Sequence, residues 1–220
     1  MKKKEEHEVI HKEAEYEKSD KDETKAKILV IRDAKSRVCA AIPVPRKGAD
    51  NEDWNLKEAL RFLEFLGYTN VVMKSNQEGA LAALLSKIRS HRGDQTQTMQ
   101  ELSPVGDSKS NGCIERTIQS VQGQIRTLRS ALEARIGAEI NPTGPIFAWL
   151  IGHAANIINL FEIGKDGRVP YQRLRGRKMH TELVEFGECV CYQPLKHLEL
   201  GKAESRWESG VFLGFKLNSG

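Results

Sequence analysis

The sequence predicts an α/β fold, in which a mixed sheet is flanked by helices and followed by a small β-rich C-terminal appendage. Two observations support this prediction. Short apolar runs of strand length alternate with segments whose apolar residues recur at helical spacing, a rhythm typical of helices packed on a sheet. From Phe186 onward, short apolar runs instead stand between glycines, which is typical of small strands.

The individual elements follow from local patterns. Residues 28–31 form a continuous apolar run that predicts a buried strand, and residues 37–44 predict a second strand after a turn at residues 33–36. Residues 54–66 carry leucines at helical spacing before Gly67, which predicts a helix with a glycine at its end. The same reasoning predicts strands at 70–74 and 96–102, and helices at 78–89 and 146–160.

The longest predicted helix covers residues 111–136. Its apolar residues advance by three or four positions and form one continuous stripe, made of Ile114, Ile118, Val121, Ile125, Leu128, Leu132 and Ile136. The arginines of this helix are expected to lie off that stripe; they are Arg116, Arg126, Arg129 and Arg135.

The chain is expected to divide into three parts. Residues 1–27 carry eight lysines and nine acids with few apolar residues, so we expect a charged, disordered leader. Residues 28–180 are expected to form the α/β domain. Residues 181–220 are expected to form a short β segment that is truncated, because the chain stops just after an apolar strand.

Composition excludes several classes of protein. Charged residues make up 29% of the 220 residues, and no apolar run approaches the roughly 18 residues needed to span a bilayer, so no membrane partner is expected. The N-terminus is charged and lacks a secretory signal, and the four cysteines lack metal-site spacing. We therefore expect an intracellular protein, nuclear or cytoplasmic, with reduced thiols.

One loop concentrates positive charge. Between Gly164 and Lys178 a single acid, Asp166, stands among six basic residues, which are Lys165, Arg168, Arg173, Arg175, Arg177 and Lys178. Such a cluster can contact the phosphates of a nucleic acid, and it can equally be a solvated surface.

The most informative stretch is Ser103–Arg116. Serine, asparagine and glycine crowd before the long helix, and Glu115 follows in its first turn at the edge of the apolar stripe. This arrangement can hold a metal-binding carboxylate rigidly against a substrate loop. A solvated first-turn acid, stabilised by the helix dipole, is the simpler structural interpretation of Glu115.

Taken together, these motifs resemble the catalytic core of copia-type retrotransposon and retroviral integrases, a family of the RNase H-like superfamily. The resemblance covers residues 28–220. It rests on separated matches in the same order, which are Ile31-Arg32-Asp33 with Ser36-Arg37, Lys74 to Glu78, Ser103 to Arg116, Gln119 to Leu132, Gly164 to Gly167 with Tyr171, and Arg206 to Gly214. The resemblance implies an RNase H-like sheet, with Mg²⁺ or Mn²⁺ as cofactor.

The family's metal site is a triad of acids, and this chain departs from it. Glu115 matches the third acid. At the second place the family has Ser-Asp where this chain has Ser75-Asn76, and Asn76 precedes Glu115 by 39 residues, a spacing within the family's range. The nearest counterpart of the first acid is Glu15, so the catalytic set carried over is Glu115, Asn76 and Glu15, with Glu115 and Glu15 as metal ligands. Asp33 is not expected to be a ligand.

The resemblance also implies partners and a function. DNA is the expected partner, both retroelement ends and target DNA, contacted by the basic loop together with Lys109 and Asn111, and a homo-oligomer is expected. The function implied is metal-dependent polynucleotidyl transfer during DNA integration, impaired here because the triad is degenerate. The alternatives are a noncatalytic nucleic-acid-binding or assembly module that keeps the fold, and a relic without selected activity.

Overall fold

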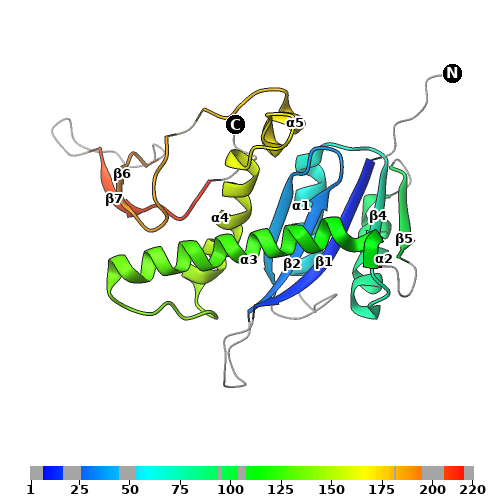
Figure 1. Ribbon diagram of the computed structural model, residues 1–220, viewed down its shortest axis with the longest axis horizontal. Coiled ribbons are helices and arrows are strands. Elements are labelled where there is room, and N and C mark those ends of the chain that lie inside the picture. The colour runs from blue at the N-terminus through cyan, green and yellow to red at the C-terminus, as the bar shows by residue number, and fades with distance from the viewer. Residues whose placement is uncertain are drawn as a thin grey trace.

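A computed structural model of the chain describes residues 7–16, 26–44, 53–93, 96–103, 108–180, 182–194 and 206–215, and for residues 7–16 and 108–110 it describes the backbone alone. The centre of the molecule is a five-stranded sheet in the order β3-β2-β1-β4-β5 (Figure 1). The strands are β1 (His7–Tyr16), β2 (Ala26–Asp33), β3 (Cys39–Val44), β4 (Val71–Ser75) and β5 (Thr98–Leu102).

The sheet is mixed, as the sequence predicts. β2 pairs antiparallel with both β1 and β3, whereas β4 runs parallel to both β1 and β5. Parallel neighbours need crossover connections. α1 (Trp54–Leu66) stands before β4, and α2 (Gly79–Arg92) carries the chain from β4 to β5.

The expected disordered leader contains the middle strand of this sheet, so that expectation is wrong for residues 7–16. The backbone of β1 pairs with β2 from Val9 opposite Asp33 to Tyr16 opposite Ala26, and with β4 from His7 opposite Val71 to Ile10 opposite Lys74. Residues 7–16 form a strand because they pair with a neighbouring strand on each side, and the local composition does not show these pairings. Residues 1–6 and 17–25 of the leader lie outside the described residues.

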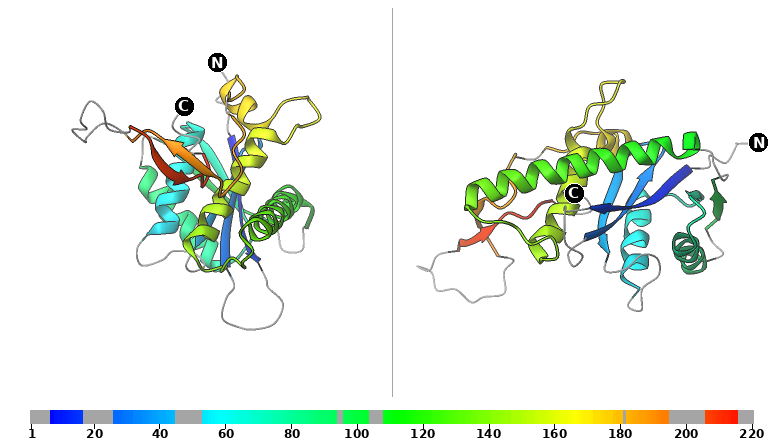
Figure 2. Two further views of the ribbon diagram at one scale, coloured as in Figure 1. Left: turned by 90° about the vertical axis from the view of Figure 1, so that its left-hand side faces the viewer. Right: turned by 60° about the horizontal axis from the view of Figure 1, so that its bottom comes forward.

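Helices cover both faces of the sheet (Figure 2). Alternate residues of β2 belong to two separate apolar clusters, because successive side chains of a strand point to opposite faces. Leu29 and Ile31 pack in the cluster that contains α1 and α2. Ile28 and Val30 pack in the cluster that contains α3 (Ser108–Ile136) and α4 (Pro145–Phe161).

Most helix bounds confirm the sequence predictions. α1 spans the predicted residues and ends at Gly67, whose φ of 75° gives the left-handed conformation that glycine adopts at little cost. α3 differs from its prediction at two residues. Arg129 is only 8% exposed, and its guanidinium donates hydrogen bonds to Glu133 and to the Ile140 carbonyl, at 2.7 and 3.0 Å. Ile136, expected on the buried stripe, is 52% exposed.

The C-terminal segment packs on α4. After α5 (Pro170–Arg175), strands β6 (Cys189–Tyr192) and β7 (Glu208–Val211) form the small sheet that the sequence predicts. The ring of His153 in α4 is surrounded by those of Phe186, Phe212 and Phe215, with centroids 5.3 to 6.1 Å away. None of the helices in the described part of the chain is both long and apolar enough to cross a membrane.

The environment of His153 predicts a pH-dependent stability. The side chain is 3% exposed and its Nδ1 has no hydrogen-bond partner, so burial lowers its pKa from the ordinary value of 6.5. The unfolded chain then binds more protons than the folded one, and stability falls as the pH drops below about 6.5. We expect a lower melting temperature at pH 5.5 than at pH 7.5, and a smaller difference in His153→Phe.

His91 provides the control, because its side chain is exposed on α2. His91→Gln is expected to keep the pH dependence of the wild type. An equally strong pH dependence in His153→Phe would contradict the assignment to His153.

Candidate functional site

The first part of the candidate site is the end of β4. Ser75, the last residue of this strand, is fully buried, and Asn76 follows it directly. The Asn76 side-chain Oδ1 accepts a hydrogen bond from the backbone N–H of Glu78 at 3.4 Å, so the amide shapes the turn that leads into α2. Glu78 precedes the first residue of α2 and takes part in this turn through its backbone.

A buried serine links this strand end to α3. The backbone N–H of Ser103, the residue after β5, donates to the Ser75 carbonyl at 2.9 Å, and its hydroxyl donates to Asn111 Oδ1 at 2.8 Å. The Ser103 carbonyl accepts from Gln77 Nε2 at 3.3 Å. Ser103 itself is 2% exposed, whereas its hydrogen bonds with Asn111 and Gln77 are part-buried. Ser103 therefore joins the end of β4 to the first turns of α3, a role the sequence analysis missed.

Glu115 lies one turn after Asn111 on α3. Residues four apart on a helix share a face, so Glu115 stands on the side of α3 that Ser103 ties to the strand end. Buried Ile114 and the Arg32 guanidinium, which donates to the Cys113 carbonyl at 3.0 Å, hold this turn on the sheet. Glu115 is half-buried. The structure thus brings Asn76 and Glu115 to the same edge of the sheet.

Glu15 lies elsewhere on β1. It pairs with Lys27 of β2, five residues beyond Ile10, which stands opposite Lys74. Asn76 comes two residues after Lys74, so the same parallel register continued by two residues meets β1 at Lys12. Strands rise about 3.3 Å per residue, which places the backbone of Glu15 roughly 10 Å further along β1 than the level of Asn76.

The donors at this edge differ from those that Mg²⁺ prefers. Magnesium needs hard, charged oxygen ligands in near-octahedral geometry, and a two-metal site needs several carboxylates. Of the residues carried over from the acidic triad, those whose side chains are described at this edge are Glu115, a carboxylate, and Asn76, a neutral amide. Across the part of the chain whose side chains are described, no three His, Cys, Asp or Glu residues gather where they can hold a metal ion. This donor set does not fit the metal site that the sequence resemblance implies.

The basic loop separates into structural and exposed residues. Arg173 donates to Asp166 through Nε at 2.9 Å, and this hydrogen bond holds the pKa of the Asp166 carboxyl well below its usual range. Arg175 lies 4.6 Å from the centre of the Phe65 ring and donates to the Phe65 carbonyl. The remaining exposed basic residues are Lys165, Arg168, Arg177 and Lys178. The side chain of Lys109 lies outside the described residues.

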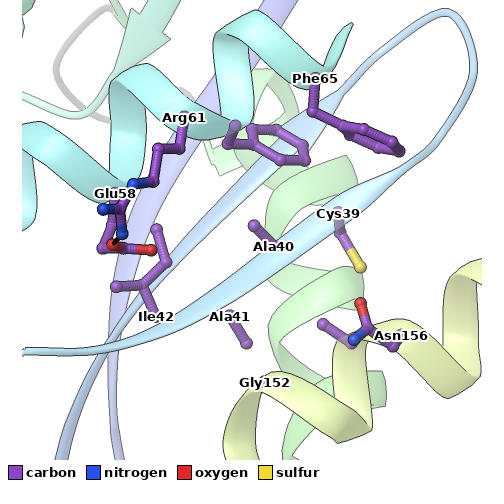
Figure 3. A pocket seen from close by; sticks show the side chains of 11 residues that line it. Cys39, Ala40, Ala41, Ile42, Glu58, Arg61, Phe65, Gly152 and Asn156 are labelled. Carbon is purple, nitrogen blue, oxygen red and sulfur yellow. Dashed lines mark hydrogen bonds and ion pairs between the residues drawn. The ribbon is translucent and has the colours of Figure 1, made fainter. Parts of the chain in front are cut away.

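A hollow in the structure lies away from this edge, between α1, β3 and α4 (Figure 3). It has a volume of about 260 Å³ and is lined mainly by apolar side chains, with the Glu58–Arg61 ion pair at its rim. Burial raises the pKa of the Cys39 thiol there to about 12, so the thiol stays protonated at neutral pH. β2 and β1 separate β3 from β4, and the hollow is therefore distinct from the edge that carries Asn76.

Solved structures share this architecture. The catalytic core of HTLV-2 integrase, solved with magnesium in a trimeric form, matches 77% of this chain and 96% of its own length, with 15% identity and a TM-score of 0.53. Its dimeric form gives 13% identity and a TM-score of 0.51. The chain has the fold of a retroviral integrase catalytic core. The expected RNase H-like fold is thereby confirmed.

A larger assembly gives the same result. The simian T-cell lymphotropic virus intasome, solved with the PP2A regulatory subunit B56 gamma, matches 93% of this chain and 67% of its own chain, with 16% identity and a TM-score of 0.56. The sequence itself matches no protein-family model and no curated protein. At these identities the integrase-core fold is the shared property.

The Ser103 link predicts a local loss of stability. Ser103→Ala removes the hydroxyl and leaves the side-chain Oδ1 of Asn111 without this donor, which is expected to cost about 1 kcal/mol in the free energy of unfolding. Urea unfolding measures this cost, and hydrogen exchange is expected to quicken in residues 111–115. Ser90→Ala, which removes an exposed hydroxyl on α2, is expected to change the stability by less than about 0.5 kcal/mol. Equal effects of the two substitutions would contradict the role of Ser103.

Proposed function

We propose that this chain is an integrase-core-like domain of a retrotransposon polyprotein, which binds DNA and whose metal-dependent polynucleotidyl transfer is impaired. The observation that supports the proposal is the Ser103 link, which joins Ser75, the residue before Asn76, to Asn111, one helix turn before Glu115. The positions agree with the second and third acids of the integrase triad, whereas the side chain at position 76 is neutral. A homo-oligomer inside the cell, in the nucleus or the cytoplasm, belongs to the same proposal.

The physical reason for the impairment is the charge of the ligand set. A carboxylate offers two oxygens and a full negative charge, whereas the Asn76 amide offers one oxygen and no charge. In a partly buried site the lost attraction to a divalent cation amounts to several kcal/mol. In the register of β1 and β4, the residue of β1 level with Asn76 is Lys12. Lys12 is a basic residue, so this position lacks an acid as well.

A noncatalytic nucleic-acid-binding or assembly module is the second candidate. It is favoured by four exposed basic residues of the loop other than Arg175, namely Lys165, Arg168, Arg177 and Lys178, which need no metal to contact phosphates. Both candidates share DNA binding and differ in whether the site regains chemistry once its acids are restored.

DNA binding is expected to depend strongly on salt. Each phosphate contact contributes about −0.9 to the slope of log K against log salt, so four contacts give a slope of roughly −3 to −4. Fluorescence anisotropy with a labelled duplex, between 50 and about 200 mM salt, measures this slope. An affinity that stays constant over this range would contradict the proposal. Strand-transfer and 3′-processing assays in Mg²⁺ are expected to show no product.

Restoring carboxylates tests the impairment. Asn76→Asp alone is expected to raise the affinity for Mg²⁺ measured by calorimetry only slightly, because Glu15 lies three residues further along β1. Since Lys12 is level with Asn76 in the register of β1 and β4, Lys12→Asp together with Asn76→Asp is expected to raise the affinity much further. The matched control is Asn70→Asp, which adds the same charge before the start of β4.

The outcomes separate the candidates. Strand transfer in the double variant supports a degenerate enzyme, whereas magnesium binding without any strand transfer supports the noncatalytic module. Robust 3′-processing by the wild type would refute the impairment. An equal gain in Asn70→Asp would show that the added charge acts without a site.

A further inference from the structure

The turn between β2 and β3 is built around a buried acid. Asp33 is fully buried, and its carboxylate accepts hydrogen bonds from the Ser36 backbone N–H at 2.8 Å, from the Ser36 hydroxyl and from the Tyr68 hydroxyl at 3.0 Å. Burial and the neighbouring Asp33 charge raise the pKa of Tyr68, which therefore stays protonated as a donor. This network fixes the turn and leaves Lys35 and Arg37 exposed at its tip.

Arg37 occupies an unfavourable backbone conformation. Its φ is 66°, in the left-handed region that costs a residue with a side chain roughly 1 kcal/mol and costs glycine almost nothing. Within the described part of the chain, its guanidinium makes no hydrogen bond or ion pair that offsets this cost. A glycine would suit the turn better, so a cation at this position points to a role outside the fold.

Arg173 holds the basic loop against this turn. Its guanidinium donates to the Ser36 carbonyl at 3.4 Å, and also to Asp166 and to the Arg168 carbonyl at 2.8 Å. Gly164 makes room for it, because a Cβ there would lie 1.9 Å from Arg173 Nη2. Figure 1 shows α5, which carries Arg173, beside the turn at the end of the β2–β3 hairpin.

The joined surface is strongly positive. Its exposed cations are Lys35, Arg37, Lys165 and Arg168. Two of the nearby acids are already engaged within the fold, since Asp33 is buried in the turn and Asp166 is paired with Arg173. Among the described residues of this loop and turn, the other acid is Glu162, which is exposed. Arg32, just before Asp33, contacts the α3 turn that precedes Glu115, so this surface begins beside the candidate site.

We propose that the β2–β3 turn and the loop at residues 164–168 form one phosphate-binding surface for the backbone of a nucleic-acid duplex, with Lys35 and Arg37 as contact residues. The inference rests on the proposed DNA-binding function and extends it to a turn outside the basic loop. Phosphates are the fitting ligand because four exposed cations gather on this surface, and contacts to a phosphate backbone need positive charge without reading the bases.

Arg37→Gly provides the test, because it removes the charge and at the same time removes the cost of the left-handed backbone conformation. The melting temperature is expected to stay constant or rise. The affinity for a duplex is expected to fall about eightfold at 0.1 M salt, and the salt slope to weaken by about 0.9, because one phosphate contact is lost. A merely structural Arg37 would give the opposite pattern, with stability changed and the salt slope unchanged.

Controls separate this inference from the proposed function. Arg89→Gln removes an exposed charge on α2 and is expected to leave the affinity unchanged. Salt-dependent binding by the wild type that is unaffected by Arg37→Gly would overturn the inference and leave DNA binding intact. A wild type that does not bind the duplex would overturn both. Competition by polyglutamate as effective as that by DNA would overturn the choice of a nucleic acid.

Discussion

The hydrogen bonds of Ser103, a buried residue, are the constraint on which the arrangement of the site depends. They connect a strand end to the start of a helix through one residue, whose backbone N–H bonds to Ser75 and whose hydroxyl bonds to Asn111. Buried donors and acceptors are expensive to leave unpaired, so this link keeps α3 at a fixed distance from β4. None of these bonds involves a carboxylate or a metal. The geometry of the edge therefore does not require the charges that a catalytic site would need.

Local patterns were sufficient to predict most elements and insufficient for β1. α1 was predicted with its observed bounds because leucine spacing and Gly67 are encoded within the helix itself. β1 is held by two partners distant in sequence, β2 and β4, which its own charged composition does not reveal. The position of Glu15 could not be predicted for the same reason, since register is a property of paired strands.

Counting charges could not distinguish structural from exposed arginines. Arg173 and Arg175 belong to a basic run in the sequence, yet one binds Asp166 and the other lies over Phe65. Arg129 was expected off the apolar stripe of α3, and it is buried there against Glu133 and the Ile140 carbonyl. A guanidinium has five donors and can satisfy carbonyls and carboxylates inside a fold. Only the three-dimensional structure shows which cations are exposed, and it adds Lys35 and Arg37 from a separate turn.

The chemistry of Asn76 explains how a fold of this kind tolerates an amide at that position. Its Oδ1 accepts from the Glu78 N–H, a bond that an aspartate oxygen makes equally well, so folding does not discriminate between the two side chains. Selection for an acid would then have to come from a bound cation alone. The cations of the β2–β3 turn and the loop lie on different elements from Asn76 and depend on Asp33 and Asp166 for their placement. A neutral side chain at the edge therefore leaves the proposed phosphate-binding surface intact, and the proposed DNA binding does not require catalysis.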